Sequence, residues 1–180
     1  MKVTRTALPE VLILEPRVFE DSRGFFYEAY NRKSWANAEI NFEFVQDNQS
    51  FSKKNVLRGL HYQIRQPQGK VVRALRGTIF DVAVDLRRSS PNFGKSVHVT
   101  LSAENRNMLW IPAGFAHGFL VLSDVAEVLY KTTDFYAPEH ERTLLWDDPK
   151  LAIPWPEAAE PILSDKDRRG LPLDKAELFD

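Results

Sequence analysis

Apolar and polar residues alternate along much of the chain in short runs, and this period of two is typical of β-strands. The clearest run spans residues 78–86, where every second residue from Phe80 to Leu86 is apolar and Asp81 and Asp85 fall on the other face. We expect these two aspartates to have structural partners. Further extended runs are predicted over residues 11–16, 42–48, 56–63, 70–77, 95–101 and 127–136, and on either side of a turn within 109–122. Residues 21–28 begin with a turn signal, and the aromatic residues that follow it favour a strand.

Helix is predicted in two places only. Residues 31–41 have an apolar stripe, formed by Trp35, Ala38 and Ile40. Residues 174–179 are expected to form a closing helical turn, and frequent prolines after Ala137 exclude long helices before it. Many short strands, regular turn signals and little helix predict one all-β domain over residues 1–180, either a sandwich or a barrel.

Composition narrows the class of protein. A chain of 180 residues is long enough for one well-packed domain, and its net charge of -1 argues against a general nucleic-acid or membrane surface. The absence of cysteine excludes disulfides and thiolate metal sites. No signal-peptide core and no run of membrane-spanning length is visible, so we expect a soluble cytoplasmic protein.

The predicted strand 56–63 places polar side chains in an apolar setting. If the run is extended, His61 and Gln63 share a face with Gly59, where the missing side chain leaves room for close approach. Burying a histidine and the neighbouring Arg58 costs free energy unless both find partners. For His61 alone, the simplest interpretation is a structural histidine that is satisfied by one hydrogen bond. Whether it has a functional role depends on the residues that the rest of the chain supplies.

A short motif in residues 112–117 indicates which all-β fold is present. It reads Pro-Ala-Gly-Phe-Ala-His and matches the Pro-x-Gly-x-x-His core of the second cupin motif, which points to a double-stranded β-helix, a jelly-roll barrel with a ligand in its mouth. Metal cupins carry His-x-His and a nearby Glu in their first motif, whereas this chain has His61-Tyr62-Gln63, no close Glu, and Val121 in place of the usual Asn. Two distant imidazoles are too few for a stable zinc or iron site, so a metal cupin is disfavoured.

An ordered set of motifs resembles the dTDP-4-dehydrorhamnose 3,5-epimerase family nearly from end to end. The segments that carry the resemblance are 21–26, 44–48, 57–63, 68–70, 115–119 and 163–170. Gln49 and Asn55 depart from the residues that are common in the family. The resemblance implies a homodimer that needs neither metal nor cofactor. It also implies inversion of C3 and C5 of a dTDP-linked 4-keto-6-deoxyglucose, which gives the precursor of activated L-rhamnose for cell-surface polysaccharide.

The same resemblance implies roles for individual residues, and the chemistry suits them. Epimerisation beside a ketone needs a base, an acid on the other face and a charge at the enolate oxygen. His61 is the expected base, Asp167 orients it, Lys70 stabilises the O4 oxyanion and Tyr130 returns a proton. Substrate binding is expected from Arg23, Phe26, Glu28, Gln46, Asp47, Asn48, Arg58, Gln63, Lys70, His117, Tyr136, Glu141 and Lys166.

Several of these side chains can be placed against parts of a nucleotide sugar. Arg23 and Arg58 suit phosphate oxygens, because a guanidinium fork matches them, and Tyr136 can stack on thymine. By resemblance, some N-terminal contacts come from a partner subunit through strand exchange, but the sequence does not assign them.

Other interpretations stay open at this point. Taken singly, Tyr130 is a strand aromatic, Lys70 a solvated strand end and Asp167 a turn-former. Within the same enzyme class, an epimerase that acts at C3 or C5 alone would have nearly identical motifs. A metal-dependent cupin oxygenase or isomerase is disfavoured by Gln63. A non-catalytic sugar-binding jelly roll would retain His61, Lys70, Tyr130 and Asp167 together only by coincidence.

Overall fold

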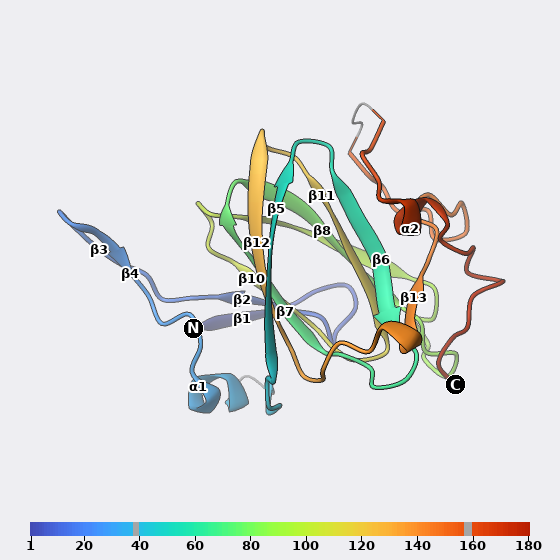
Figure 1. Ribbon diagram of the computed structural model, residues 1–180. Coiled ribbons are helices and arrows are strands. Elements are labelled where there is room, and N and C mark those ends of the chain that lie inside the picture. The colour runs from blue at the N-terminus through green and yellow to red at the C-terminus, as the bar shows by residue number, and fades with distance from the viewer. Residues whose placement is uncertain (38–39, 157–159) are drawn as a thin grey trace.

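A computed structural model describes residues 1–37, 40–156 and 160–180, and its architecture is almost entirely β (Figure 1). The strands are β1 (Lys2–Arg5), β2 (Leu12–Glu15), β3 (Phe19–Asp21), β4 (Gly24–Phe26), β5 (Gln46–Lys53), β6 (Leu57–Gln63), β7 (Lys70–Arg76), β8 (Thr78–Asp85), β9 (Ser96–Ser102), β10 (Met108–Ile111), β11 (Phe115–Val121), β12 (Val125–Thr132) and β13 (Glu141–Thr143). The helices are α1 (Arg32–Ala36), the 3-10 turn η1 (Pro138–His140) and α2 (Asp165–Arg168).

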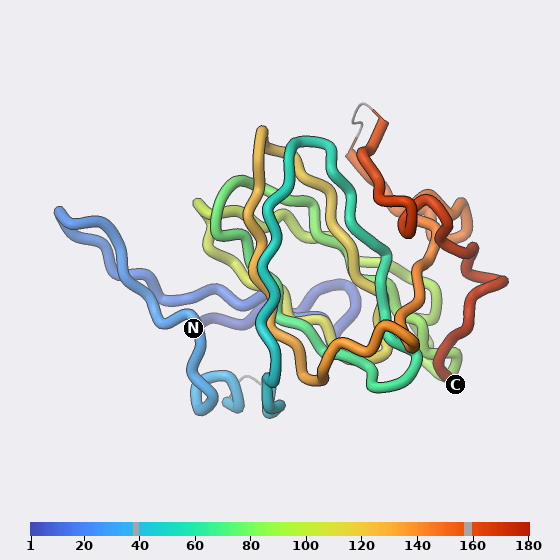
Figure 2. Tube along the Cα trace, in the orientation of Figure 1, coloured from blue at the N-terminus to red at the C-terminus, as the bar shows by residue number. Residues whose placement is uncertain are grey.

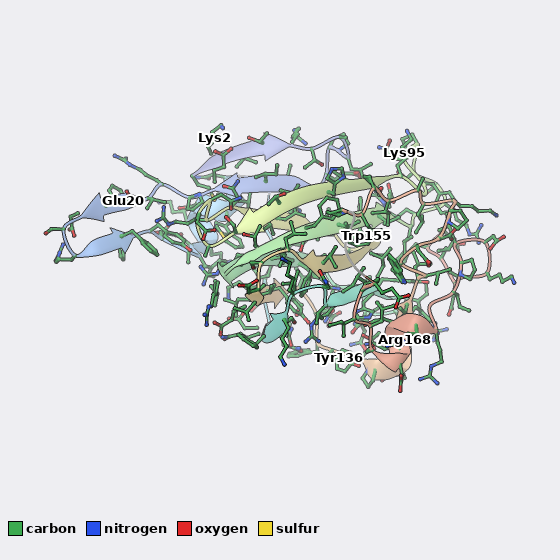
Figure 3. The ribbon with its side chains drawn as sticks, turned by 90° about the horizontal axis from the view of Figure 1, so that it is seen from above. Lys2, Glu20, Lys95, Tyr136, Trp155 and Arg168 are labelled. Carbon is green, nitrogen blue, oxygen red and sulfur yellow. The ribbon has the colours of Figure 1, made fainter. Side chains whose placement is uncertain are left out.

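Two antiparallel sheets face each other and form the predicted jelly-roll barrel. One has the strand order β1-β2-β10-β7-β12-β5, and the other has the order β13-β6-β11-β8-β9. A third, two-stranded sheet of β3 and β4 projects from the barrel as a separate arm, shown in blue in Figures 1 and 2. Seen from above, Glu20 lies on this arm, far from Tyr136 and Arg168 at the other end of the molecule (Figure 3).

The five-stranded sheet is buried on both faces, and this explains its nearly unbroken apolar sequence. One face, with Ile79 and Ala83 of β8, packs between the two sheets. On the opposite face, the predicted row from Phe80 to Leu86 is covered by the C-terminal segment, including Trp155. In the tube view this segment, in orange and red, runs along the outside of the barrel (Figure 2). The alternation seen in residues 78–86 is therefore confirmed, but both of its faces are buried.

A smaller core on the outer face of the other sheet explains the early helix. Asn31 caps α1 by accepting hydrogen bonds from the backbone of Lys33 and Ser34, and Trp35 packs against Met108 and Trp110. The predicted helix 31–41 is confirmed only for its first part, because α1 ends at Ala36 and Asn37 caps it. Ala38 lies outside the described residues.

Three other expectations need correction. The strand predicted over residues 42–48 begins only at Gln46, since residues 41–45 have no regular structure although Phe42 stacks on Trp110. No helix forms over residues 174–179; there the chain makes a turn and Phe179 bridges Arg87. The short C-terminal helix is instead α2, where the sequence had suggested a turn.

Elsewhere the predicted strands are confirmed within a few residues. The segment 127–136 is strand only as far as Thr132, and three short strands, β1, β3 and β13, were not predicted. In the described residues no helix has both the length and the apolar character needed to cross a lipid bilayer.

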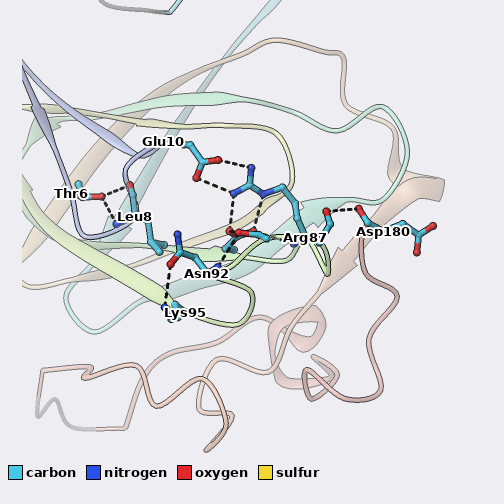
Figure 4. A network of polar contacts seen from close by, with 10 residues as sticks. Thr6, Leu8, Glu10, Arg87, Asn92, Lys95 and Asp180 are labelled. Atoms are coloured by element: carbon cyan, nitrogen blue, oxygen red, sulfur yellow. Dashed lines mark hydrogen bonds and ion pairs between the residues drawn. The ribbon is translucent and has the colours of Figure 1, made fainter.

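Asp85 is completely buried and is the centre of a charge network. Figure 4 shows two labelled members of this network, Arg87 and Glu10. Asp85 accepts hydrogen bonds from Arg87 at 2.7 and 2.9 Å and from Ser90 at 2.6 Å. Arg87 also reaches Glu10 in the β1–β2 connection at 2.8 Å. Burial works to raise the pKa of Asp85, but these hydrogen bonds outweigh it and lower the pKa. As expected, Asp85 has a structural partner.

We predict that Arg87→Ala lowers the free energy of unfolding by roughly 3 kcal/mol, because it leaves the fully buried Asp85 carboxylate without its cation. The exposed pair of Lys150 and Asp174 provides a matched control, and Lys150→Ala should leave the free energy of unfolding nearly unchanged, because solvent screens this pair. Urea unfolding measures both changes. Equal losses in the two variants would contradict a special role for the buried pair.

Candidate active site

A cavity of about 330 Å³ lies between the two sheets and is lined mostly by polar side chains. It gathers residues from strands of both sheets, from the loops that follow β6 and β12, and from α2. The lining residues are Gln46, Asn48, Ser50, Arg58, His61, Gln68, Lys70, His117, Phe119, Tyr130, Tyr136, Glu141 and Lys166. Three of the four predicted catalytic residues, His61, Lys70 and Tyr130, therefore line the same cavity. The fourth, Asp167, is outside the lining and is hydrogen-bonded to His61.

His61 is held by a carboxylate from a distant part of the chain. Its Nε2 lies 2.5 Å from Oδ1 of Asp167, a buried residue of α2. Burial works to raise the pKa of Asp167, but the hydrogen bonds from His61 and Ser164 outweigh it and lower the pKa. An ionised carboxylate only accepts, so Nε2 carries the proton and Nδ1 keeps a free lone pair.

Ser164 supports this arrangement and was not predicted. Its hydroxyl donates to the second oxygen of Asp167 at 2.7 Å and accepts from the backbone N–H of the same residue at 3.2 Å. Ser164 is also the N-cap of α2. The spacing of serine and acid in residues 164–167 was the available signal, because a capping serine followed by an acid three residues later is typical of a helix start.

The protonation state of His61 suits a base. Burial lowers the pKa of His61 below its ordinary value, although the hydrogen bond to Asp167 works in the opposite direction. The imidazole is therefore neutral at neutral pH and can take up a proton. Its partner stabilises the imidazolium that forms.

Tyr130 faces His61 from the opposite wall of the cavity. It belongs to β12 of the six-stranded sheet, whereas His61 belongs to β6 of the five-stranded sheet, and both side chains line the same space. Burial raises the pKa of Tyr130, and the charge of Glu141 adds to this effect. The phenol therefore keeps its proton and can donate it.

Lys70 supplies a buried positive charge between these walls. It opens β7, is 8 % exposed, and donates weakly to the carbonyl of His61 at 3.5 Å. Burial lowers the pKa of Lys70 to about 8, and the charges of Glu141 and Asp81 limit the fall. The ammonium is thus charged at neutral pH in a dry site, where its field is strong.

A second imidazole in the cavity also has a carboxylate partner. His117 lies opposite His61 in the register of β11 and β6, and its Nε2 is 2.9 Å from Asp81. Asp81 is completely buried, and burial raises its pKa despite the opposing effect of His117. The structural partner expected for Asp81 is therefore a residue that lines the cavity.

One end of the cavity is closed by a chain of polar contacts. Glu141 accepts from Lys166 at 2.8 Å and from the Tyr136 hydroxyl at 3.1 Å, and the backbone N–H of Tyr136 donates to Gln46 at 3.0 Å. Gln46 in turn donates to Asn48 at 2.8 Å. These five predicted residues thus form a connected edge around a half-exposed aromatic ring.

Five predicted binding residues lie outside the cavity of their own chain. Asp47 points to the other face of β5 and pairs with Lys131 at 2.8 Å. Gln63 is buried, but its amide binds the loop backbone at Gln66, Phe135 and Ala137. Arg23 and Phe26 are on the exposed arm, and Glu28 accepts from Asn31 and Ser34 near α1.

Ser50, Gln68 and Phe119 line the cavity but were not predicted. Ser50 is notable because its hydroxyl oxygen is buried and has no hydrogen-bond partner. The alternation of β5 was the available signal: Gln46, Asn48 and Ser50 share the inner face. Among the described residues, no group of three or more histidine, cysteine or acidic side chains is placed to hold a metal ion.

The fold and the site together define a class: a cupin-like all-β barrel whose cavity holds a histidine–carboxylate pair, a buried lysine and a tyrosine from the opposite sheet. The family model described as dTDP-4-dehydrorhamnose 3,5-epimerase matches residues 5–175. The chain belongs to this family, as the sequence predicted.

Individual relatives agree with the family. The chain is 61% identical over 180 residues to a dTDP-4-dehydrorhamnose 3,5-epimerase of Pseudomonas aeruginosa, with 99% of each chain covered. The dTDP-6-deoxy-D-glucose-3,5-epimerase of Legionella pneumophila, solved in complex with dTDP-4-keto-L-rhamnose, superposes with a TM-score of 0.96 at 49% identity and covers 98% of this chain and 94% of its own.

A more distant structure has a different regiochemistry. ChmJ, a 3'-monoepimerase from Streptomyces bikiniensis in complex with dTDP-quinovose, matches with a TM-score of 0.88 at 34% identity, covering 94% of this chain and 87% of its own. The fold is therefore common to enzymes with different numbers of inverted carbons. The named relatives make this chain an epimerase.

We predict a fall in kcat/KM as the pH rises above about 8, because Lys70 then loses its proton. Lys70→Met should reduce the rate by about 10²–10³ at neutral pH, and its residual rate should no longer fall above pH ~8. A pH–rate profile of both proteins measures this. An alkaline limb that persists unchanged in Lys70→Met would assign that limb to another group.

Proposed function

We propose that the chain inverts C3 and C5 of dTDP-4-dehydro-6-deoxy-D-glucose to give dTDP-4-dehydro-L-rhamnose, through an enolate and without a metal or cofactor. The observation that carries the proposal is the placing of His61 and Tyr130 on opposing cavity walls with Lys70 beside them. Inversion needs a base and an acid on opposite faces of one carbon, and this pair supplies both. The product would serve the synthesis of activated L-rhamnose.

Each half-reaction balances with these three residues. Nδ1 of His61 takes the proton from the carbon next to the C4 ketone, and the electron pair of that C–H bond forms the enolate. Negative charge develops on O4, where the Lys70 ammonium stabilises it. Tyr130 then gives its proton to the other face of the carbon, and the double bond collapses back to the ketone. Proton exchange with water restores His61 and Tyr130 for the second carbon.

The polar edge of the cavity suits the rest of the substrate. Tyr136 would stack on thymine, with Gln46, Asn48, Glu141 and Lys166 around the nucleoside. Arg58 would bind phosphate, and His117 the sugar. Asp47 and Gln63 do not line the cavity, so they would support substrate binding indirectly. Asp47 would do so by holding β5 on β12, and Gln63 by fixing the loop before η1.

The remaining predicted contacts support a homodimer. Arg23 and Phe26 lie on an arm that extends away from the barrel, so they cannot line their own cavity in this arrangement. We propose that each arm, with Glu28 at its base, completes the cavity of a partner subunit. A cytoplasmic location remains a prediction.

The reaction is tested by incubation with dTDP-4-dehydro-6-deoxy-D-glucose in heavy water with a chelator present, followed by NMR. We predict deuterium at both C3 and C5. In Tyr130→Phe, inversion should fall by about 10²–10⁴ while exchange at C5 with retained configuration persists, because His61 can still remove and return that proton.

Each other result has a distinct meaning. No deuterium at either carbon in the folded wild-type protein would sink the proposal. Deuterium at one carbon only would make the chain a monoepimerase, and loss of activity on chelation would contradict the metal-free mechanism. If Tyr130→Phe loses exchange together with inversion, the phenol acts in proton removal.

Arm exchange is tested by co-expressing Arg23→Ala with His61→Asn. In a mixed dimer, the site with an intact His61 receives the intact arm of the other chain. Random pairing should therefore restore about one quarter of wild-type activity at low substrate concentration, well above the two variants measured apart. Activities that only average would contradict exchange.

A further inference from the structure

The arm has two distinct faces. In its register Glu20 pairs with Phe25, and Phe19 pairs with Phe26. Directly paired residues of a hairpin lie on the same face, and consecutive pairs lie on opposite faces. One face therefore carries Glu20 and Phe25, while the other carries two aromatic rings that are 52% and 71% exposed.

Arg106, in the turn between β9 and β10, contacts the first of these faces, on which the Phe25 ring is 58% exposed. Its Nη1 lies 3.1 Å from Oε1 of Glu20, and its guanidinium carbon lies 4.2 Å from the centre of the Phe25 ring. One barrel side chain thus contacts both strands of the arm. It is only 21% exposed, in contrast to Arg23 at 87%.

Further contacts link the Glu20–Phe25 face of the arm to the barrel. Phe25 stacks on Tyr27 at 5.9 Å, and the Tyr27 hydroxyl accepts from Arg73 of β7 at 3.4 Å. The Nε of Arg106 is buried without a hydrogen-bond partner, so this side chain gives up a hydrogen bond in the position that it occupies. Together these contacts hold the Glu20–Phe25 face of the arm on its own barrel. The Phe19–Phe26 face lines a pocket with Trp35 of α1, where Arg17 lies 4.9 Å from the centre of the Phe19 ring, and the side chains of Phe26 and Arg23 remain exposed.

We propose that Arg106 is a positioning residue: it fixes the direction of its own arm so that Arg23 and Phe26 reach the cavity of a partner subunit. The inference rests on the proposed function, in which the arm completes that cavity. Arg106 lies outside the cavity lining and touches no catalytic side chain. Without it the arm samples other directions, and the substrate binds only the fraction of sites whose arm is in place.

The expected effect is therefore on KM rather than on kcat. An exposed ion pair and a cation–π contact together correspond to about a three- to thirtyfold change in the competent fraction. Arg106→Ala should raise KM by about tenfold and leave kcat within about twofold. Arg106→Lys keeps the charge but loses the planar fork, so its KM should be intermediate.

Two other variants separate arm direction from folding. Glu20→Gln removes the contact from the exposed side of the arm and should also raise KM, even if Arg106→Ala fails to fold. Glu104→Ala, in the same β9–β10 turn and exposed, is the matched control and should leave KM unchanged. Unchanged KM in both Arg106→Ala and Glu20→Gln would overturn the inference.

A mixing experiment decides whether Arg106 acts on its own site or on that of its partner. After co-expression with His61→Asn and random pairing, about half of the active sites should show the low KM, because the cavity of the Arg106→Ala chain in a mixed dimer receives the wild-type arm; the Arg106→Ala homodimers keep the high KM. If KM stays high, Arg106 acts within its own barrel and the inference fails. If Arg23→Ala is not rescued by His61→Asn either, arm exchange itself is wrong, and an inactive wild-type protein would refute the proposed reaction instead.

Discussion

The hydrogen bond between His61 and Asp167 is the interaction on which the site depends. It joins β6 of the five-stranded sheet to α2, and the two residues are 106 positions apart in the chain. Because the ionised carboxylate can only accept, the bond sets the imidazole tautomer and leaves the Nδ1 lone pair free to take up a proton. The C-terminal segment that carries Asp167 also covers the outer face of β8 with Trp155. The packing of this segment on the barrel therefore also determines the geometry of the His61–Asp167 pair.

Burial tunes the three catalytic groups in the same direction, toward their neutral forms. It lowers the pKa values of His61 and Lys70 and raises that of Tyr130. For a base and an acid this is the useful state, whereas for Lys70 it is a cost, which Glu141 and Asp81 limit. The acidic residues around the cavity thus favour the charged form of Lys70 between two groups, His61 and Tyr130, that burial keeps neutral.

The sequence predicted the barrel well because period-two patterns and the motif at residues 112–117 are local signals. It predicted His61, Lys70 and Tyr130 through family resemblance, and the cavity brings them together. Gln63 illustrates what local patterns miss: its strand face is correct, but its amide satisfies loop carbonyls that only tertiary structure brings near. Likewise α2 was taken for a turn, since four residues with a serine cap carry too little helical periodicity.

Phe42 shows a different limit. Its apolar neighbours favoured a strand, yet β5 begins only at Gln46, although the backbone N–H of Val45 donates to Thr132 of β12. Phe42 stacks on Trp110 while 49% exposed, and Phe44 packs against the core around Trp35. Apolar residues report packing, not hydrogen-bond pairing, so an irregular segment that packs its rings on the barrel has the same pattern as a strand. The arm is the opposite case: its turn and aromatics were recognised, but its direction depends on Arg106, which is distant in sequence.

The regiochemistry of the proposed reaction cannot lie in the catalytic residues alone. C3 and C5 both adjoin C4, so removal of either proton places the charge on the same O4, beside Lys70. If the sugar ring can turn about O4, a single base and a single acid can therefore serve both carbons. If the sugar ring is held in one orientation, they can serve only one carbon. In the proposed complex the cavity wall and the arm would hold the ring, because they would contact the nucleotide and sugar outside the reacting atoms. A fold shared with a monoepimerase at a TM-score of 0.88 fits this division, in which the barrel supplies the chemistry and the surrounding contacts set how many times it occurs.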